Sequence, residues 1–390
     1  MLPLEGITVV SLEHAVAAPF ATRQLADQGA RVIKVERPGV GDFARGYDTR
    51  VRGEASHFVW INRSKESLTL DLKHASAAPV LRGLVARADV VVQNLAPGAA
   101  ARLGLSYDAL KVDHPGLIVC NISGYGADGP DRDRKAYDLL IQSEAGFLSV
   151  TGTEGQPSKA GISIADIAAG MYAYTNILTA LIQRGRTGAG REIDVSMLEA
   201  MAEWMGYPMY YAFDGAAPPA RAGASHATIY PYGPFDAADG TVMLGLQNER
   251  EWAAFCSQVL NAPGLAADPR FASNGKRAEN KVALAAIITK GFAALTVAQA
   301  TARLDAAGIA NARMNDMAGL WAHPQLAARQ RWRQVQTPAG AVPALIPAGW
   351  GEGEPRMGPV PALGAQSAAI LQELGYDPAA IAGFAADGVI

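Results

Sequence analysis

Short apolar runs and stretches with helical spacing alternate over roughly the first third of the chain. Apolar runs rich in β-branched residues and bounded by polar turns are typical of buried strands. They cover residues 7–12, 30–35, 88–93 and 117–122, and strict alternation of polar and apolar residues predicts one more strand over residues 67–72. Helical spacing is clearest between them at residues 18–25 and 76–87. Strands that alternate with helices in this way predict an α/β fold with a parallel, doubly wound sheet.

The longest helical stretch covers residues 168–184, with Asp166 at its start and Gly185 as its expected end, and residues 191–197 predict a further strand. The pattern then changes. Residues 213–227 are rich in Ala, Gly and Pro, which indicates a linker. A hairpin is predicted over residues 230–245, around Asp239 and Gly240, and mostly helical structure follows over residues 249–330.

These patterns predict two domains. We expect a large Rossmann-like parallel-sheet domain over residues 1–212 and a smaller α+β domain over residues 228–330. Residues 361–376 regain a helical register, so we expect residues 331–390 to return to the large domain and complete it.

Composition narrows the class of protein. The 390 residues are 49% hydrophobic and 18% charged, as in ordinary soluble enzymes, and the net charge of −3 provides no field for nucleic acid or an anionic membrane. Cys120 and Cys256 are the only cysteines, which fits a reducing compartment and excludes a disulfide scaffold. We see no signal peptide and no apolar run of membrane-spanning length, and therefore expect a cytoplasmic protein.

Several familiar site motifs are missing from the sequence. The first strand-to-helix turn, residues 14–19, contains no glycine, which counts against a nicotinamide oxidoreductase even though Glu36 ends the second strand. His14 in this turn is expected to be structural. No metal-ligand spacing, P-loop or nucleophile elbow is present, so we expect no metal.

Asp166 is the strongest candidate for chemistry. An aspartate at a helix start is a favoured N-cap, and that structural interpretation has the higher base rate. The alternative is that the carboxylate is a covalent nucleophile. The residues around it are small enough for a bulky acyl group to approach, namely Gly161, Ala165, Ala168, Ala169 and Gly170.

Two further groups of residues allow a functional and a structural interpretation. Arg45, Arg50 and Arg52 lie in one short segment and can clamp a free carboxylate, or they can be solvated surface charge. The glycine-rich loop 124–130 leads to Tyr137 and Asp138, which can line a site or simply pack and cap a helix.

The chain also resembles the class III CoA-transferase family, which includes formyl-CoA and carnitine CoA-transferases. The order and spacing of several segments carry this resemblance, rather than any one of them. The segments are ARVIKVERPG at 30–39, NRSKESLTLDL at 62–72, QNLAPG at 93–98, ISGYG at 122–126, KAYD at 135–138, GAGREIDVSM at 188–197, LG at 363–364 and LQELGY at 371–376.

The resemblance implies a set of site residues. The family's catalytic aspartate falls on Asp166. The contacts to coenzyme A, the co-substrate, fall on Ala15, Arg37, Leu70, Asn94, Leu95, Ala99, Arg102, Leu103 and Lys135. The acyl pocket falls on Val16, Tyr47, His57, Tyr137 and Asp138. The family's two chains interlock as a homodimer, and residues 213–227 and 332–353 suit the linkers that this arrangement needs.

The departures from the family pattern limit the substrate. Val16 and Tyr47 replace the residues that contact oxalate in formyl-CoA transferases, and residues 221–227 lack the usual glycine-rich lid. Oxalate is therefore not expected as the acceptor. The cluster of Arg45, Arg50 and Arg52 suggests an acid with a second carboxylate, and within the family the chain most resembles enzymes that use succinyl-CoA. This resemblance implies succinyl-CoA as the donor and a dicarboxylic acid such as itaconate, mesaconate or malate as the acceptor, through an aspartyl-CoA thioester. Two alternatives stay open: a 2-methylacyl-CoA racemase, disfavoured because Tyr137 replaces its histidine, and a non-catalytic acyl-CoA-binding protein.

Overall fold

The computed structural model describes residues 1–351 and 353–390. The chain divides into two compact units. The first consists of Met1–Ala145, Ala160–Met205 and Leu326–Ile390, and the second of Gly146–Lys159 and Gly206–Gln325. Gly146–Lys159 was predicted to belong to the large domain, but in the structure this segment belongs to the second unit.

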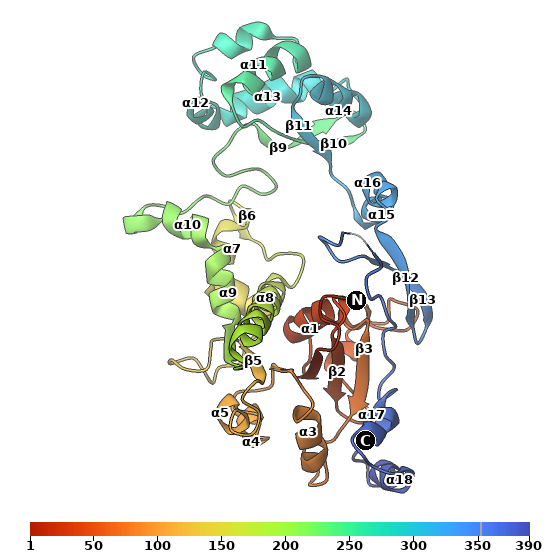
Figure 1. The fold of residues 1–390 in the computed structure, drawn as a ribbon. Coiled ribbons are helices and arrows are strands. Elements are labelled where there is room, and N and C mark those ends of the chain that lie inside the picture. The colour runs from red at the N-terminus through yellow and green to blue at the C-terminus, as the bar shows by residue number, and fades with distance from the viewer. Residues whose placement is uncertain (352) are drawn as a thin grey trace. The chain divides into compact units, whose positions relative to one another are not determined.

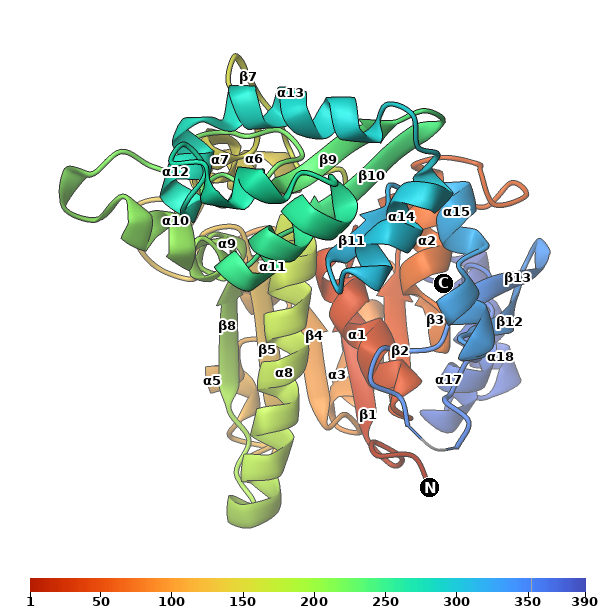
Figure 2. The same ribbon diagram turned by 90° about the horizontal axis from the view of Figure 1, so that it is seen from above.

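A parallel sheet of six strands forms the centre of the first unit, in the order β3-β2-β1-β4-β5-β8. Strands β2, β3 and β5 are labelled in Figure 1, and every strand of the sheet is labelled in Figure 2. Its strands are β1 Thr8–Leu12, β2 Arg31–Glu36, β3 Lys65–Thr69, β4 Val90–Gln93, β5 Ile118–Ser123 and β8 Glu192–Ser196. Every pair of neighbours is parallel, so the sheet predicted from the apolar runs is confirmed. The strand order reverses between β1 and β4, and ligands of such sheets bind beyond the carboxyl ends of the strands at this point.

Helices cover both faces of this sheet. Helices α1 (Ala17–Asp27) and α8 (Ile164–Thr187) pack against each other on one face, which faces the viewer in Figure 2. Helix α3 (Ala77–Val85) covers the opposite face, where α17 (Ser367–Glu373) and α18 (Pro378–Ala386) join the same apolar core. The shorter helices of this unit are α2 Ser56–Ile61, α4 Ala99–Arg102, α5 Tyr107–Leu110, α6 Asp138–Glu144 and α9 Met197–Trp204, with a 3₁₀ turn at Phe43–Gly46.

The C-terminal segment is bonded to the edge strand β3. The Thr69 amide donates to Ser367 Oγ at 3.0 Å and the Ser67 amide to Gln366 Oε1 at 2.8 Å. The predicted linker at residues 332–353 is wrong over most of its length. It contains the antiparallel pair β12 (Trp332–Thr337) and β13 (Gly340–Leu345). Pro338, Gly340, Pro343 and Pro347 give this segment the composition of a linker, but Pro338 lies in a two-residue turn and Gly340 begins β13.

The second unit combines a small antiparallel sheet with helices. The predicted hairpin is confirmed as β9 (Tyr232–Ala237) and β10 (Gly240–Gly245), and β11 (Ala310–Arg313) adds a strand within a region predicted to be mostly helical. Its remaining elements are α7 Phe147–Val150, β6 Gly152–Thr153, β7 Gln156–Pro157, α10 Gly206–Tyr211, α11 Glu249–Ala254, α12 Asn274–Glu279, α13 Lys281–Phe292, α14 Val297–Ala306 and α15 Met317–Trp321, while α16 Pro324–Ala328 leads back into the first unit.

Among the described residues no single helix is both long and apolar enough to span a bilayer. Only α13 and α14 together meet that test, as a pair bent by 108°. Both helices place buried apolar side chains in the core of the second unit.

Candidate active site

A cavity of about 510 Å³ opens at the carboxyl ends of β1, β4 and β5, within the first unit. This is the edge at which the strand order reverses. Ten of the residues predicted for the site line it: Ala15, Val16, Tyr47, His57, Asn94, Leu95, Lys135, Tyr137, Asp138 and Asp166. The tertiary structure therefore brings the predicted nucleophile together with all five residues of the predicted acyl pocket and with four of the nine predicted CoA contacts.

Asp166 is not the N-cap of its helix. Helix α8 begins at Ile164 with Ser163 as its N-cap, and Asp166 lies in the first turn. The Asp166 carboxyl group is half-buried and has no hydrogen bond or ion pair with any described residue. Burial, and then the nearby Asp138 carboxylate, raise the pKa of Asp166 to about 7. The positive end of the α8 dipole acts in the opposite direction, because it favours the ionised carboxylate.

Asp138 performs the capping that the sequence analysis considered for Asp166. Its Oδ1 accepts from the Ala165 amide at 2.8 Å, at the N-terminus of α8. Its Oδ2 accepts from the Gln142 side chain at 2.7 Å. Because Asp138 caps the Ala165 amide, the Asp166 carboxyl group is not needed for that bond and remains available for chemistry.

Gly170 brings the start of α1 close to Asp166. It lies four residues after Asp166 and so on the same face of α8. A Cβ atom at position 170 would be 2.7 Å from the Ala17 carbonyl oxygen and 3.0 Å from the Phe20 ring. Only glycine permits this approach. The small residues of this helix, which were expected to make room for an acyl group, thus serve helix packing at Gly170.

The turn between β1 and α1 forms one wall of the cavity. Its conformation is fixed by Asn94, which accepts from the His14 amide at 3.0 Å and donates to the His14 carbonyl at 2.9 Å. The His14 ring packs against Phe43 with centroids 5.1 Å apart, and burial lowers its pKa. His14 is therefore placed as a packed, neutral side chain, as the sequence analysis expected.

Tyr47 and His57 form a second, aromatic wall. Their rings meet edge to face at 5.4 Å. Burial, and then the charges of Asp42 and Asp166, raise the pKa of Tyr47 to about 12, so its hydroxyl group stays protonated at neutral pH. The Nδ1 atom of His57 is buried without a hydrogen-bond partner among the described residues. An unpaired buried acceptor is tolerated better than an unpaired N–H, which favours the tautomer with its proton on Nε2.

The structure does not assemble the predicted arginine clamp. None of Arg45, Arg50 and Arg52 lines the cavity. The Arg45 guanidinium bonds to the buried Glu36 carboxylate at 2.7 Å and stacks on Phe58 at 3.7 Å. Arg52 donates to the Ala341 carbonyl at 3.2 Å, and Arg50 is exposed. Arg45 serves as the ion-pair partner of Glu36, because this buried carboxylate would otherwise be an unpaired charge.

Five of the predicted CoA contacts lie outside this cavity: Arg37, Leu70, Ala99, Arg102 and Leu103. Leu70 is 1% exposed and belongs to the core of the sheet, so its side chain does not face a ligand site. Arg102 is exposed, and Arg37 donates to the Gly41 carbonyl at 3.4 Å. Exposed basic side chains that the sequence analysis did not select, Arg132 and Arg134, line the cavity beside Lys135.

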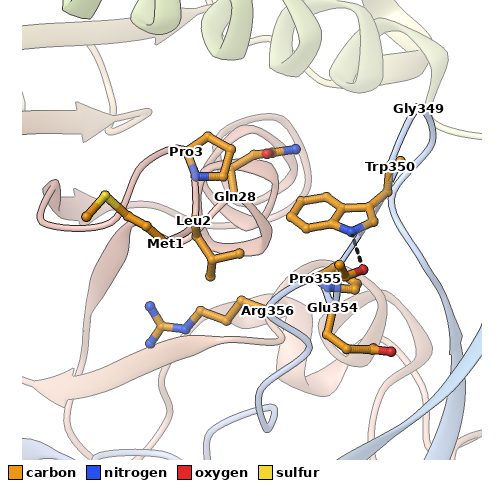
Figure 3. A pocket seen from close by; sticks show the side chains of 11 residues that line it. Met1, Leu2, Pro3, Gln28, Gly349, Trp350, Glu354, Pro355 and Arg356 are labelled. Atoms are coloured by element: carbon orange, nitrogen blue, oxygen red, sulfur yellow. Dashed lines mark hydrogen bonds between the residues drawn. The ribbon is translucent and has the colours of Figure 1, made fainter.

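A second cavity of about 750 Å³ lies at the N-terminus of the same unit (Figure 3). Met1, Leu2, Pro3 and Trp350 contribute to its lining, and it shares no lining residue with the Asp166 cavity. No group of three or more possible metal ligands occurs among the described residues.

Comparison with known proteins places the chain in a family. The model of "CoA-transferase family III" matches residues 4–367. The succinyl-CoA:glutarate CoA-transferase of Mus musculus is 33% identical over 100% of this chain and 91% of that protein. The succinyl-CoA:mesaconate CoA-transferase of Haloarcula hispanica is 34% identical over 72% of each chain.

The fold agrees with that assignment. A crystal structure of a CAIB/BAIF family protein from Brucella suis superposes with a TM-score of 0.85 at 33% identity, covering 96% of this chain and 99% of that one. The chain therefore belongs to the CoA-transferase family III.

Proposed function

We propose that this CoA-transferase moves CoA from succinyl-CoA to a small dicarboxylic acid, with Asp166 as the covalent nucleophile. The observation that carries the proposal is the Asp166 carboxyl group, which borders the cavity without a hydrogen-bond or ion-pair partner among the described residues. A carboxyl group with no structural partner, held on a rigid helix at a ligand cavity, is arranged for chemistry.

The exchange needs no metal and no net proton transfer. The Asp166 carboxylate attacks the thioester carbonyl and expels CoA thiolate, which leaves an aspartyl-acyl anhydride. The thiolate then attacks the Asp166 acyl carbon, releases the donor acid and forms the aspartyl-CoA thioester. The acceptor carboxylate attacks that thioester and expels the thiolate again. The thiolate finally attacks the acceptor's acyl carbon and restores Asp166.

The surroundings supply what a weak carboxylate nucleophile requires. The N-terminal turn of α1 reaches the cavity with no side-chain cap and no acidic residue, so the Ala17 and Ala18 amides are available to stabilise a developing oxyanion. Pro19 has no N–H, and the Phe20 amide donates to the Val16 carbonyl. Burial keeps the carboxylate poorly solvated, which raises its reactivity once it is ionised.

The acceptor's second carboxylate is recognised, in this proposal, by donors that line the cavity rather than by the cluster of Arg45, Arg50 and Arg52. The Tyr47 hydroxyl and the Nε2–H of His57 lie on one wall, and Tyr137 and Lys135 also line the cavity. Relatives that act on glutarate and mesaconate support a C4–C5 dicarboxylate, a range that includes itaconate. The cytoplasmic location and the interlocked homodimer are further proposals, supported by the two free, buried cysteines and by the family resemblance respectively.

The decisive experiment is intact-protein and peptide mass spectrometry after incubation with succinyl-CoA and trapping by hydroxylamine or borohydride. Label on the peptide that contains Asp166, lost in the Asp166→Asn chain, is the expected result. The Asp138→Asn chain is the matched control, because it keeps the nucleophile. An unlabelled natural chain that still binds succinyl-CoA would refute the covalent role, and α-proton exchange of a 2-methylacyl-CoA in deuterated water would then identify a racemase.

A further inference from the structure

Four buried charges lie directly behind the β1–α1 turn. The Lys34 ammonium group, fully buried on β2, is 2.8 Å from Asp42 Oδ2 and 3.4 Å from Glu13 Oε1. The Lys65 ammonium group is 2.7 Å from the same Glu13 oxygen. Two cations and two carboxylates leave the cluster without net charge. Burying such groups is costly even when they are paired, so a well-packed apolar cluster would stabilise the fold at least as well.

Asp42 connects this cluster to the turn. The Asp42 Oδ1 atom accepts from the Ala15 amide at 3.1 Å and from the Ala44 amide at 2.9 Å. Asp42 as a whole is only 3% exposed. Ala15 has φ of 61°, in the left-handed region, which costs an alanine roughly 1–2 kcal/mol. The Asp42 bond offsets this cost at a position where other folds of this type use glycine.

The strained turn lies next to the nucleophile. Ala15, Val16 and Ala17 line the Asp166 cavity, and the Ala17 carbonyl contacts α8 at Gly170, one helical turn beyond Asp166. A change in the Ala15 conformation would therefore move the amide groups that start α1 relative to the Asp166 carboxyl group. Errors of about 1 Å in such a position are known to cost on the order of a hundredfold in rate.

We propose that Asp42, charge-balanced by Lys34, is a positioning residue that holds Ala15 in the left-handed conformation and thereby fixes the first turn of α1 beside Asp166. Its effect on turnover rests on the proposed transferase function, whereas its effect on the Ala15 backbone does not.

The test compares two double variants that differ in one respect. Lys34→Met with Asp42→Asn removes both charges but keeps an oxygen acceptor for the Ala15 amide. Lys34→Met with Asp42→Leu removes the charges and the acceptor. Both leave Glu13 paired with Lys65, so neither creates an uncompensated buried charge. A third chain adds Ala15→Gly to the leucine variant, since glycine adopts φ near 60° without steric cost.

Crystal structures of the two double variants provide the readout that does not depend on activity. We expect Ala15 to keep its left-handed φ in the asparagine variant and to leave that region in the leucine variant. A leucine variant that keeps the left-handed φ would overturn the proposal.

Turnover and CoA affinity provide the second readout. We expect kcat of the leucine variant to fall at least tenfold below that of the asparagine variant. The affinity for CoA should fall as well, because Ala15 is itself among the expected CoA contacts. Adding Ala15→Gly should recover at least threefold of the lost kcat. Equal kcat in the two double variants, or no recovery with glycine, would overturn the proposal. If the natural chain turns over no acyl-CoA, the proposed function fails, but the crystallographic comparison still decides the role of Asp42.

Discussion

Replacing Asp166 with asparagine should stabilise the ligand-free protein, and more so at higher pH. The carboxyl group is buried beside Asp138, and its pKa is raised from the ordinary 3.8 to about 7. Between these pH values the folded chain retains a proton that the unfolded chain has lost. The free energy of unfolding therefore falls as the pH rises through this window. The loss begins near pH 4 and is complete above about pH 7.

The size of this effect follows from the pKa difference. A shift of about three pKa units corresponds to a ceiling of about 4 kcal/mol. The side chain is half-buried and water can reorganise around it, so we expect roughly 1–2 kcal/mol. For a unit of this size, that corresponds to a rise in Tm of about 2–8 °C at pH 8. Asparagine has nearly the same shape and no charge, so it removes the penalty without leaving a cavity.

The assay is calorimetry of the ligand-free chains between pH 4.5 and pH 8.5. The difference in Tm between Asp166→Asn and the natural chain should grow with pH and level off above about pH 7. Asp128→Asn, which removes an exposed carboxylate, is the matched control and should show no such growth. A Tm difference that is constant across this range, or a variant that becomes less stable as pH rises, would refute the reasoning.

Three further predictions test other parts of the site. The value of kcat/KM should rise with pH through about 7 as Asp166 ionises. Asp138→Asn should move the midpoint of this rise to lower pH, because it removes a like charge beside Asp166. A midpoint that stays in place would contradict the electrostatic interaction between the two carboxylates. Gly170→Ala should lower the free energy of unfolding by about 1–3 kcal/mol and kcat at least tenfold, since its Cβ would be 2.7 Å from the Ala17 carbonyl oxygen. Gly161→Ala is the control, because its Cβ would meet open space. It should change little in thermal melts and turnover assays. Arg45→Ala should lose about 3–5 kcal/mol in urea unfolding, because Glu36 is then buried without its partner. Its KM for the acceptor acid should change little, and Arg50→Ala should change neither quantity; a selective rise in acceptor KM for Arg45→Ala would restore the clamp hypothesis.

Much of the architecture follows from local patterns. Strands buried on both faces of a parallel sheet must be almost continuously apolar, so β1, β4 and β5 are visible in the sequence. The hairpin β9–β10 is marked by Asp239 and Gly240, whose turn chemistry is equally local. The hairpin β12–β13 has Pro338 in its turn and Pro343 within its second strand, a composition that is typical of a linker and predicts no strands.

The sequence by itself determined the strand pattern and the α/β class, because each depends on residue type and short-range spacing. Asp166 became the leading candidate through the family resemblance, because spacing alone favoured a helix cap. Only the tertiary structure decided which charges pair. Arg45 is a core partner of Glu36, Asp138 caps α8, and Asp42 holds Ala15. The physical reason is that a charged side chain takes its role from the dielectric and the partners around it, and these come from segments that are distant along the chain.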